Sequence, residues 1–167
     1  MSSITPTEVG SYVISLVGPI IIGMAAAGFT AYFALHRFYR EKWWEKKYQA
    51  YDDLIGSLYE LQILHRNAII EYRFKQYLDE EPPIKVDLER WQELEASVKK
   101  MLAFSPMKLT SSTQGYIKEY LDQVSSRDSK LRNQHIKRDI ILREVESVII
   151  SIIPKIVEEA RVELKNK

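Results

Sequence analysis

An uncharged, largely apolar run of 25 residues, from Ser11 to Leu35, constrains this chain more than any other feature. A helix rises about 1.5 Å per residue, so the run exceeds the ~20 residues needed to cross about 30 Å of hydrocarbon. A core helix in a chain of 167 residues is rarely apolar on every face. The run therefore predicts a transmembrane helix over residues 11–35.

Two other interpretations of this run are a secretory signal peptide and a buried hairpin. A signal peptide has a positively charged start and a shorter apolar core. The ten residues before the run contain no Lys or Arg, and apolar or small residues continue past the Ala25–Ala27 triplet that resembles a cleavage site. These differences favour a membrane span over a cleaved signal.

The residues after the run give its expected orientation. Residues 36–48 carry five Lys and Arg against two Glu, and the positive-inside rule places such a flank in the cytoplasm. We expect residues 1–10 to form an extracytoplasmic tail, with the N-terminus outside, and residues 36–167 to form a cytoplasmic helical domain. The cations and aromatic rings expected at the membrane interface are Arg37, Arg40, Lys42, Trp43 and Trp44.

Small side chains recur along the predicted span. Such residues let helix backbones approach closely in lipid, so they favour association of several copies, four or more if the spans surround a pore. The alternative is that Gly and Ala are simply common in membrane helices. The candidate packing or pore-lining residues are Gly18, Gly23, Ala27, Thr30 and Ala31.

The remaining sequence predicts an all-α protein, in which one N-terminal transmembrane helix continues into a cytoplasmic helical bundle of about four helices. Apolar residues recur at helical spacing after the span, so one long helix is expected to reach Leu78 before the paired prolines at 82–83. The packing stripes include Tyr48, Ile63 and Leu88. Three further helices are expected, over 87–104 with Asp87 as N-cap, over 112–125, and over 129–166 with Ser129 as cap and Pro154 as a kink or break.

The sequence offers little catalytic chemistry. The chain has no cysteine, which excludes disulfides, thiol catalysis and zinc–thiolate sites and fits a reducing compartment. Its three histidines are isolated, and His65 is expected to be an ordinary polar position on the long helix. Helical ribonucleases with paired Arg and His are a further class, but the seven residues between Arg127 and His135 exceed their spacing of four to six. We assign no catalytic residue, metal ligand or cofactor, and predict no enzymatic activity.

A basic segment, residues 127–143, carries six Lys and Arg against two Asp. On one continuous helix, Arg127, Lys130, Lys137 and Arg138 would share an arc of about 100°. The simpler interpretation is a solvated helix start. The functional interpretation is a surface for an anion, an oligonucleotide or a cyclic nucleotide, made by Arg127, Lys130, Arg132, Lys137 and Arg138.

The juxtamembrane sequence "EKWWEKKYQAYDDLIGSLYEL", together with "AR-x-x-L" at 160–164, resembles a group of small bacterial single-pass membrane proteins with a WWExK-type signature. Members of similar size and plan include the accessory membrane protein of type VI-B CRISPR systems and the channel effector of the Hailong anti-phage system. This resemblance implies the bacterial inner membrane, antiviral defence, and a partner nucleotidyltransferase or nuclease. The divergent Arg/His motif of the CRISPR protein is missing here, so no individual contact is carried over.

Two functions fit these features. The first is an oligomeric inner-membrane channel or pore of anti-phage defence, gated by a nucleic-acid or nucleotide-type ligand at the cytoplasmic domain. The second is a membrane-tethered adaptor that recruits a cytoplasmic partner protein and forms no pore.

Overall fold

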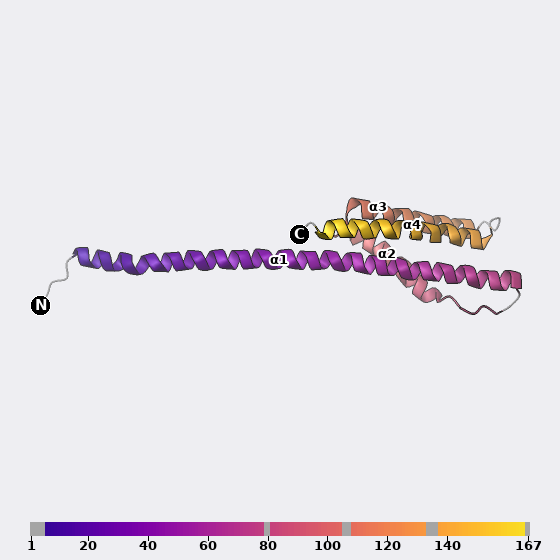
Figure 1. Cartoon of the computed structure of the whole chain (residues 1–167), viewed down its shortest axis with the longest axis horizontal. Helices are drawn as coiled ribbons and strands as arrows, with labels where there is room; N and C mark the ends of the chain where they lie inside the picture. The colour runs from indigo at the N-terminus through magenta and orange to yellow at the C-terminus, as the bar shows by residue number, and fades with distance from the viewer. Residues whose placement is uncertain (1–5, 79–80, 105–107, 133–136, 166–167) are drawn as a thin grey trace. The chain divides into compact units, whose positions relative to one another are not determined.

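A computed structural model describes residues 6–78, 81–104, 108–132 and 137–165, with the backbone alone for 6–9, 11–16, 18 and 132. The chain divides into two compact units, Met1–Trp43 and Trp44–Lys167. Every described element is helical, and no strand occurs among the described residues. The helices are α1 (Pro6–Arg73), a five-residue π-helical turn (Phe74–Leu78), α2 (Leu88–Phe104), α3 (Ser111–Arg132) and α4 (Arg138–Lys165) (Figure 1).

The second unit is a bundle of four helices, made by the part of α1 from Trp44 onward together with α2, α3 and α4. This arrangement confirms the predicted all-α class, with a long apolar helix near the N-terminus and helices packed against its continuation. The predicted helix to Leu78 is also confirmed, except that its last five residues form the π-helical turn.

Helix α1 and helix α4 lie side by side and antiparallel in the second unit (Figure 1). The Trp44 indole donates a hydrogen bond to the carbonyl oxygen of Leu164 over 3.3 Å. Further along α1, Arg66 Nε lies 3.2 Å from Glu146 Oε1. Because later residues of α1 meet earlier residues of α4, the two helices run in opposite directions over the whole contact.

The buried core of the second unit follows a seam of three- and four-residue steps on each long helix. On α1 the buried positions run from Tyr51 through Leu54, Leu58, Leu61 and His65 to Ile69. This spacing is that of helices packed along a narrow stripe. The same steps continue on the facing helices at Trp91, Leu94 and Val98; at Thr113, Ile117, Tyr120, Val124 and Arg127; and at Leu142, Val145, Ile149, Ile152 and Ile156.

The predicted packing stripes are wider than the buried faces of the helices. Tyr48, Ile63 and Leu88 were placed on buried faces, but all three side chains are exposed. Each of them falls beside the three–four seam of its helix. A four-helix bundle of this size needs only the narrow stripe, so flanking apolar residues remain at the surface.

The start of α2 matches the prediction. The backbone N–H of Arg90 donates to Asp87 Oδ1 over 2.9 Å, and the N–H of Trp91 donates to the carbonyl oxygen of Asp87 over 3.1 Å. The Asp87 side chain thus satisfies one of the amide groups left open at a helix start. This confirms Asp87 as the N-cap.

Helix α3 is longer than the sequence suggested. The prediction ended this helix near residue 125 and made Ser129 the cap of the next one, whereas α3 continues to Arg132. Serine is favoured at the start of a helix, but tertiary contacts override such local preferences. Here Arg127 lies on the inner face of α3 and is paired with Glu95 of α2, so the helix beyond Val124 is held against the bundle.

Helix α4 starts later than predicted and is not broken by its proline. It begins at Arg138 rather than at 129, and it continues through Pro154 to Lys165. The Pro154 ring is exposed, as is Ile150 one turn earlier. Because the ring disrupts the bond to the carbonyl of Ile150 on the solvent side, water can satisfy that carbonyl.

Candidate functional site

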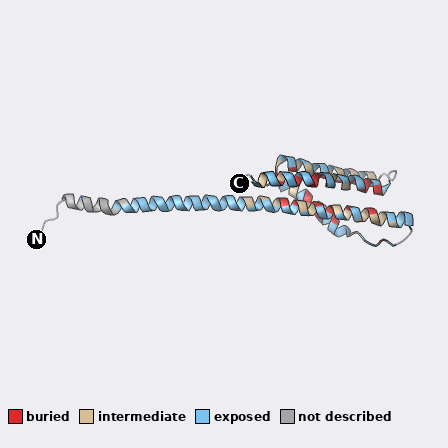
Figure 2. Ribbon diagram, viewed as in Figure 1, coloured by how far each residue is buried: buried red, intermediate tan, exposed pale blue. Residues whose placement is uncertain are grey.

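The first candidate feature is the apolar surface of α1 in the first unit. Every residue from 19 to 43 is exposed, and Ile22 reaches 70% exposure (Figure 2). One helix in the described part of the chain is long and apolar enough to cross a membrane, and none of its most apolar window is buried. A helix buried as a hairpin or core element of this chain would be covered by other residues, so the buried-hairpin interpretation is wrong.

Over residues 23–31, one face of this apolar segment carries only small side chains. At ~100° per residue, Gly23, Ala27 and Thr30 fall within about 60° of one another, with Ala31 at the edge of the arc. A Cβ added at Gly23 would meet nothing within 4 Å. The Thr30 hydroxyl donates to the carbonyl oxygen of Ala26 over 2.8 Å, so it is satisfied within the helix. The surroundings of Gly18 lie outside the described residues.

The two adjacent tryptophans have different environments. Trp43 is exposed, like Phe38 and Tyr39 before it, whereas Trp44 is half-buried and hydrogen-bonded to α4. The predicted interface cations Arg37, Arg40 and Lys42 are exposed, and Arg37 Nε lies 2.8 Å from Glu41 Oε1. Trp43 thus has the exposure of a membrane-interface residue, and Trp44 belongs to the packing of the bundle.

The predicted basic arc at 127–143 does not exist as one helix face, although Arg127 and Arg138 line one common hollow. The arc required a single helix through this segment, but residues 127–132 end α3 and residues 138–143 begin α4. His135 lies outside the described residues, as does the side chain of Arg132. The angular grouping of these cations is therefore wrong.

Two of the five predicted ligand-binding cations are engaged inside the chain. Arg127 is buried and paired with Glu95, and Lys130 is paired with Glu144 of α4. The other two described ones are exposed. The Nζ of Lys137 lies 6.0 Å from the centre of the Tyr77 ring. Arg138 lines two adjoining hollows of about 280 and 180 Å³. Ligand binding by Lys137 and Arg138 stays a prediction.

The Arg127 pair belongs to a buried polar cluster at the centre of the bundle. The two terminal nitrogens of Arg127 lie 2.6 and 3.2 Å from the two oxygens of Glu95. The Trp91 indole N–H donates to the same carboxylate over 2.5 Å, and the Arg127 guanidinium lies 5.5 Å from the Trp91 ring centre. A fork-shaped guanidinium bonded to both oxygens of a carboxylate is a strong, directional contact.

His65 completes the cluster from α1. Its ring centre lies 4.3 Å from that of Trp91, and its Nδ1 lies 2.8 Å from the carbonyl oxygen of Leu61. Burial lowers the pKa of His65 to about 4, because a charged imidazolium would lose its hydration there. Burial also raises the pKa of Tyr120, the nearby tyrosine of α3.

Two polar atoms of this cluster have no hydrogen-bond partner among the described residues, His65 Nε2 and the Tyr120 hydroxyl. The sequence interpretation missed His65, which was expected at an ordinary polar position and is fully buried. The signal was available in the spacing, since residue 65 follows Leu54, Leu58 and Leu61 on the seam. The cluster joins side chains of α1, α2 and α3.

No group of three or more metal-ligating side chains lies together in the described ranges. No protein-family model, curated protein or solved structure matches this chain.

Proposed function

We propose that this chain is a subunit of an oligomeric membrane effector, in which several spans surround a narrow channel. The observation that carries the proposal is the small-residue face at Gly23, Ala27 and Thr30 on an apolar helix whose described side chains from 19 to 43 are all exposed. In lipid, helices associate by close packing rather than by hydrophobicity, and small residues permit that packing.

The same helix face ends in charged residues. Glu41 lies eighteen residues after Gly23 and so returns to the same angular position, and Arg37 lies about 40° from it. In an assembly of several copies, the Arg37–Glu41 pairs form a ring at the inner end of the spans. Charged rings of this kind set ion selectivity in channels, while uncharged constrictions gate them by dewetting.

The basic flank supports an orientation with the N-terminus outside and the bundle in the cytoplasm, which for the resembled bacterial proteins is the inner side of the inner membrane. Under this proposal, opening of the channel depolarises the membrane during antiviral defence.

The bundle receives the activating signal in this proposal. An anionic oligonucleotide or cyclic nucleotide, supplied by a partner nucleotidyltransferase or nuclease, binds at Lys137 and Arg138. We expect Lys137→Glu combined with Arg138→Glu to abolish salt-dependent oligonucleotide binding. Full binding by that double variant would remove this part of the proposal.

The proposed span packing is tested by enlarging the small face. Gly23→Leu with Ala27→Leu should abolish both oligomers in mild detergent and conductance in planar bilayers, because the backbones can no longer approach. A matched control is Ala25→Leu with Gly28→Leu, which makes comparable changes on the opposite side of the helix. Equal behaviour of the two double variants would contradict the proposal.

A membrane-tethered adaptor is the second candidate, favoured by one observation. The core of the second unit is complete without any residue before Trp44, so the bundle does not need the span for its packing. Exchange of residues 11–35 for an unrelated poly-Leu span separates the two functions. An adaptor keeps its cellular activity after the exchange, and a channel loses it.

A further inference from the structure

An apolar patch covers one outward side of the α1–α4 pair in the second unit. At ~100° per residue, Tyr59 and Ile63 fall within about 40° of each other on α1. On α4, Ile150 and Val157 fall within about 20° of each other. Between 37% and 56% of the surface of each of these four residues is exposed. The core of the bundle therefore leaves two apolar stripes open.

The ion pair between Arg66 and Glu146 shows that the two stripes share one side of the bundle. Arg66 lies about 20° from Tyr59 around α1, and Glu146 lies about 20° from Val157 around α4. Because the two charged side chains meet across the groove between the helices, the stripes beside them adjoin as well. Single apolar residues on a surface are ordinary, but a contiguous patch of them is typical of an interface.

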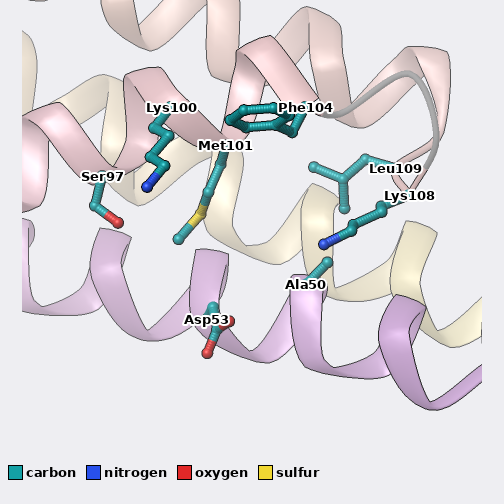
Figure 3. Close-up of a pocket in the computed structure, with 8 residues that line it drawn as sticks. All are labelled: Ala50, Asp53, Ser97, Lys100, Met101, Phe104, Lys108 and Leu109. Atoms are coloured by element: carbon teal, nitrogen blue, oxygen red, sulfur yellow. The ribbon is translucent and has the colours of Figure 1, made fainter.

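Two other sides of the bundle are more polar. Every exposed side chain described on α3 belongs to Ser, Lys, Glu or Asp. A hollow of about 230 Å³ beside α1 and α2 is lined by charged residues that include Asp53, Lys100 and Lys108 (Figure 3). A protein placed on either of these sides would have to bury charges, which is costly, whereas on the α1–α4 side it would bury apolar surface. The α1–α4 side is therefore the one suited to a protein contact.

One charge of each sign stands on the face of the two stripes. Asp52 lies about 20° from Tyr59 on α1, is exposed, and has no ion-pair partner in the described part of the chain. Arg161 lies about 20° from Ile150 on α4, and its pair with Glu158 of the same helix is more than half exposed on both partners. Interpolation between the two α1–α4 contacts described above places Asp52 within about one helical turn of the level of Arg161.

A two-fold axis parallel to the helices would match this side with itself. The rotation places α1 of one copy against α4 of a second copy at the same level and in the antiparallel sense that these helices have within one chain. Tyr59 then meets Ile150 of the second copy, and Asp52 meets Arg161 of the second copy. The side is thus complementary to itself in both apolar surface and charge, as a two-fold contact requires.

We propose that two copies of the second unit associate through this side, with α1 of each copy packed against α4 of the other. Asp52 of one copy pairs with Arg161 of the other, and Tyr59 packs on Ile150. This contact rests on the proposed assembly of the spans, because spans that hold copies together raise the local concentration of the bundles. Its own contribution is to fix the bundles of the assembly in pairs.

The chain has no cysteine, so introduced cysteines can report this contact directly. Tyr59→Cys is placed in one full-length chain and Ile150→Cys in a second, differently tagged chain, and membranes that contain both are oxidised. We expect a mixed disulfide, because the contact brings the two Cα atoms toward the ~5.5 Å that a disulfide needs. The matched control is Lys99→Cys with Asp122→Cys, at exposed positions on α2 and α3, which should give no mixed disulfide above background.

A charge exchange tests the polar part of the contact. Asp52→Arg in both chains should lower the yield of the mixed disulfide roughly tenfold, because two cations then face each other. Addition of Arg161→Asp should restore the yield. Asp53→Arg is the matched control, because it makes the same change beside the hollow at α2 and should leave the yield unchanged (Figure 3).

The bundle contact and the channel fail in different ways. An assembly of four or more copies by light scattering that gives no mixed disulfide, or as much of it from the control pair, would overturn the bundle contact and leave the channel proposal standing. A mixed disulfide from a protein that is only dimeric would support the bundle contact and contradict the channel. Equal losses of yield in Asp52→Arg and Asp53→Arg would overturn the pairing of Asp52 with Arg161.

Discussion

Helix α1 contains two regions that share one secondary structure and differ in every other respect. Residues 19–43 are exposed throughout, although they include the most apolar sequence of the chain. From Tyr51 to Ile69, the same helix buries one residue every three or four positions (Figure 2). Helix formation is therefore common to both regions, and what distinguishes them is the surroundings that their side chains require.

The largest expected contrast is between two arginines that each face a carboxylate. The Arg127 side chain is 10% exposed and is paired with Glu95 in the bundle. The Arg37 side chain is 76% exposed and is paired with Glu41 beside the span. Arg127→Gln should lower the free energy of unfolding by about 3–5 kcal/mol, because it leaves the half-buried carboxylate of Glu95 without its charge partner. Arg37→Gln should leave it unchanged.

Urea unfolding of the full chain in mild detergent, followed by circular dichroism, measures both arginine variants. Similar unfolding midpoints for Arg127→Gln and Arg37→Gln would mean that the buried pair contributes no more than a surface pair.

Two leucines give the next contrast. Leu58 is fully buried in the bundle, and Leu35 is exposed at the end of the apolar run. Leu58→Ala should cost about 2–5 kcal/mol, because it removes buried methyl groups and leaves a cavity. Leu35→Ala should not change the unfolding of the bundle, measured by the same urea titration. A comparable loss from Leu35→Ala would show that this part of the helix is packed against protein.

The smallest expected effect on stability is a pH dependence that involves His65, with His36 as its comparison. His65 has its pKa lowered to about 4 in the folded bundle, whereas a histidine of the unfolded chain titrates near 6.5. Below pH 6.5 the unfolded chain binds a proton that the folded chain does not, so stability falls as the pH falls. Between pH 7.5 and 5 the loss should be roughly 2 kcal/mol.

His65→Gln should remove most of this pH dependence, and His36→Gln should preserve it. Denaturation curves at several pH values measure the slope for each variant. A slope that persists in His65→Gln would assign the acid sensitivity to another group.

The helical architecture was largely predictable, because an apolar run, a proline pair and regular spacing each constrain the chain locally. Asp87 was identified as a cap for the same reason. The end of α3 and the start of α4 were not predictable locally. Ser129 was predicted to begin a new helix, and the contact of Arg127 with another helix overrode that preference.

The candidate sites depended on partners that no local pattern contains. Arg127 was predicted to bind a ligand because its sequence neighbours are basic, yet its partner Glu95 lies 32 residues earlier. His65 was identified as polar by residue type, although its place on the three–four seam indicated burial. Charge counts describe a segment, and only tertiary packing decides which charges reach solvent.

The most direct test of the membrane-assembly account is the mass of the purified full-length protein in mild detergent, by light scattering with the detergent contribution subtracted. The account expects one discrete species of four or more copies, held by the Gly23, Ala27 and Thr30 face. A monomer or dimer would leave too few spans to enclose a pore and would contradict it.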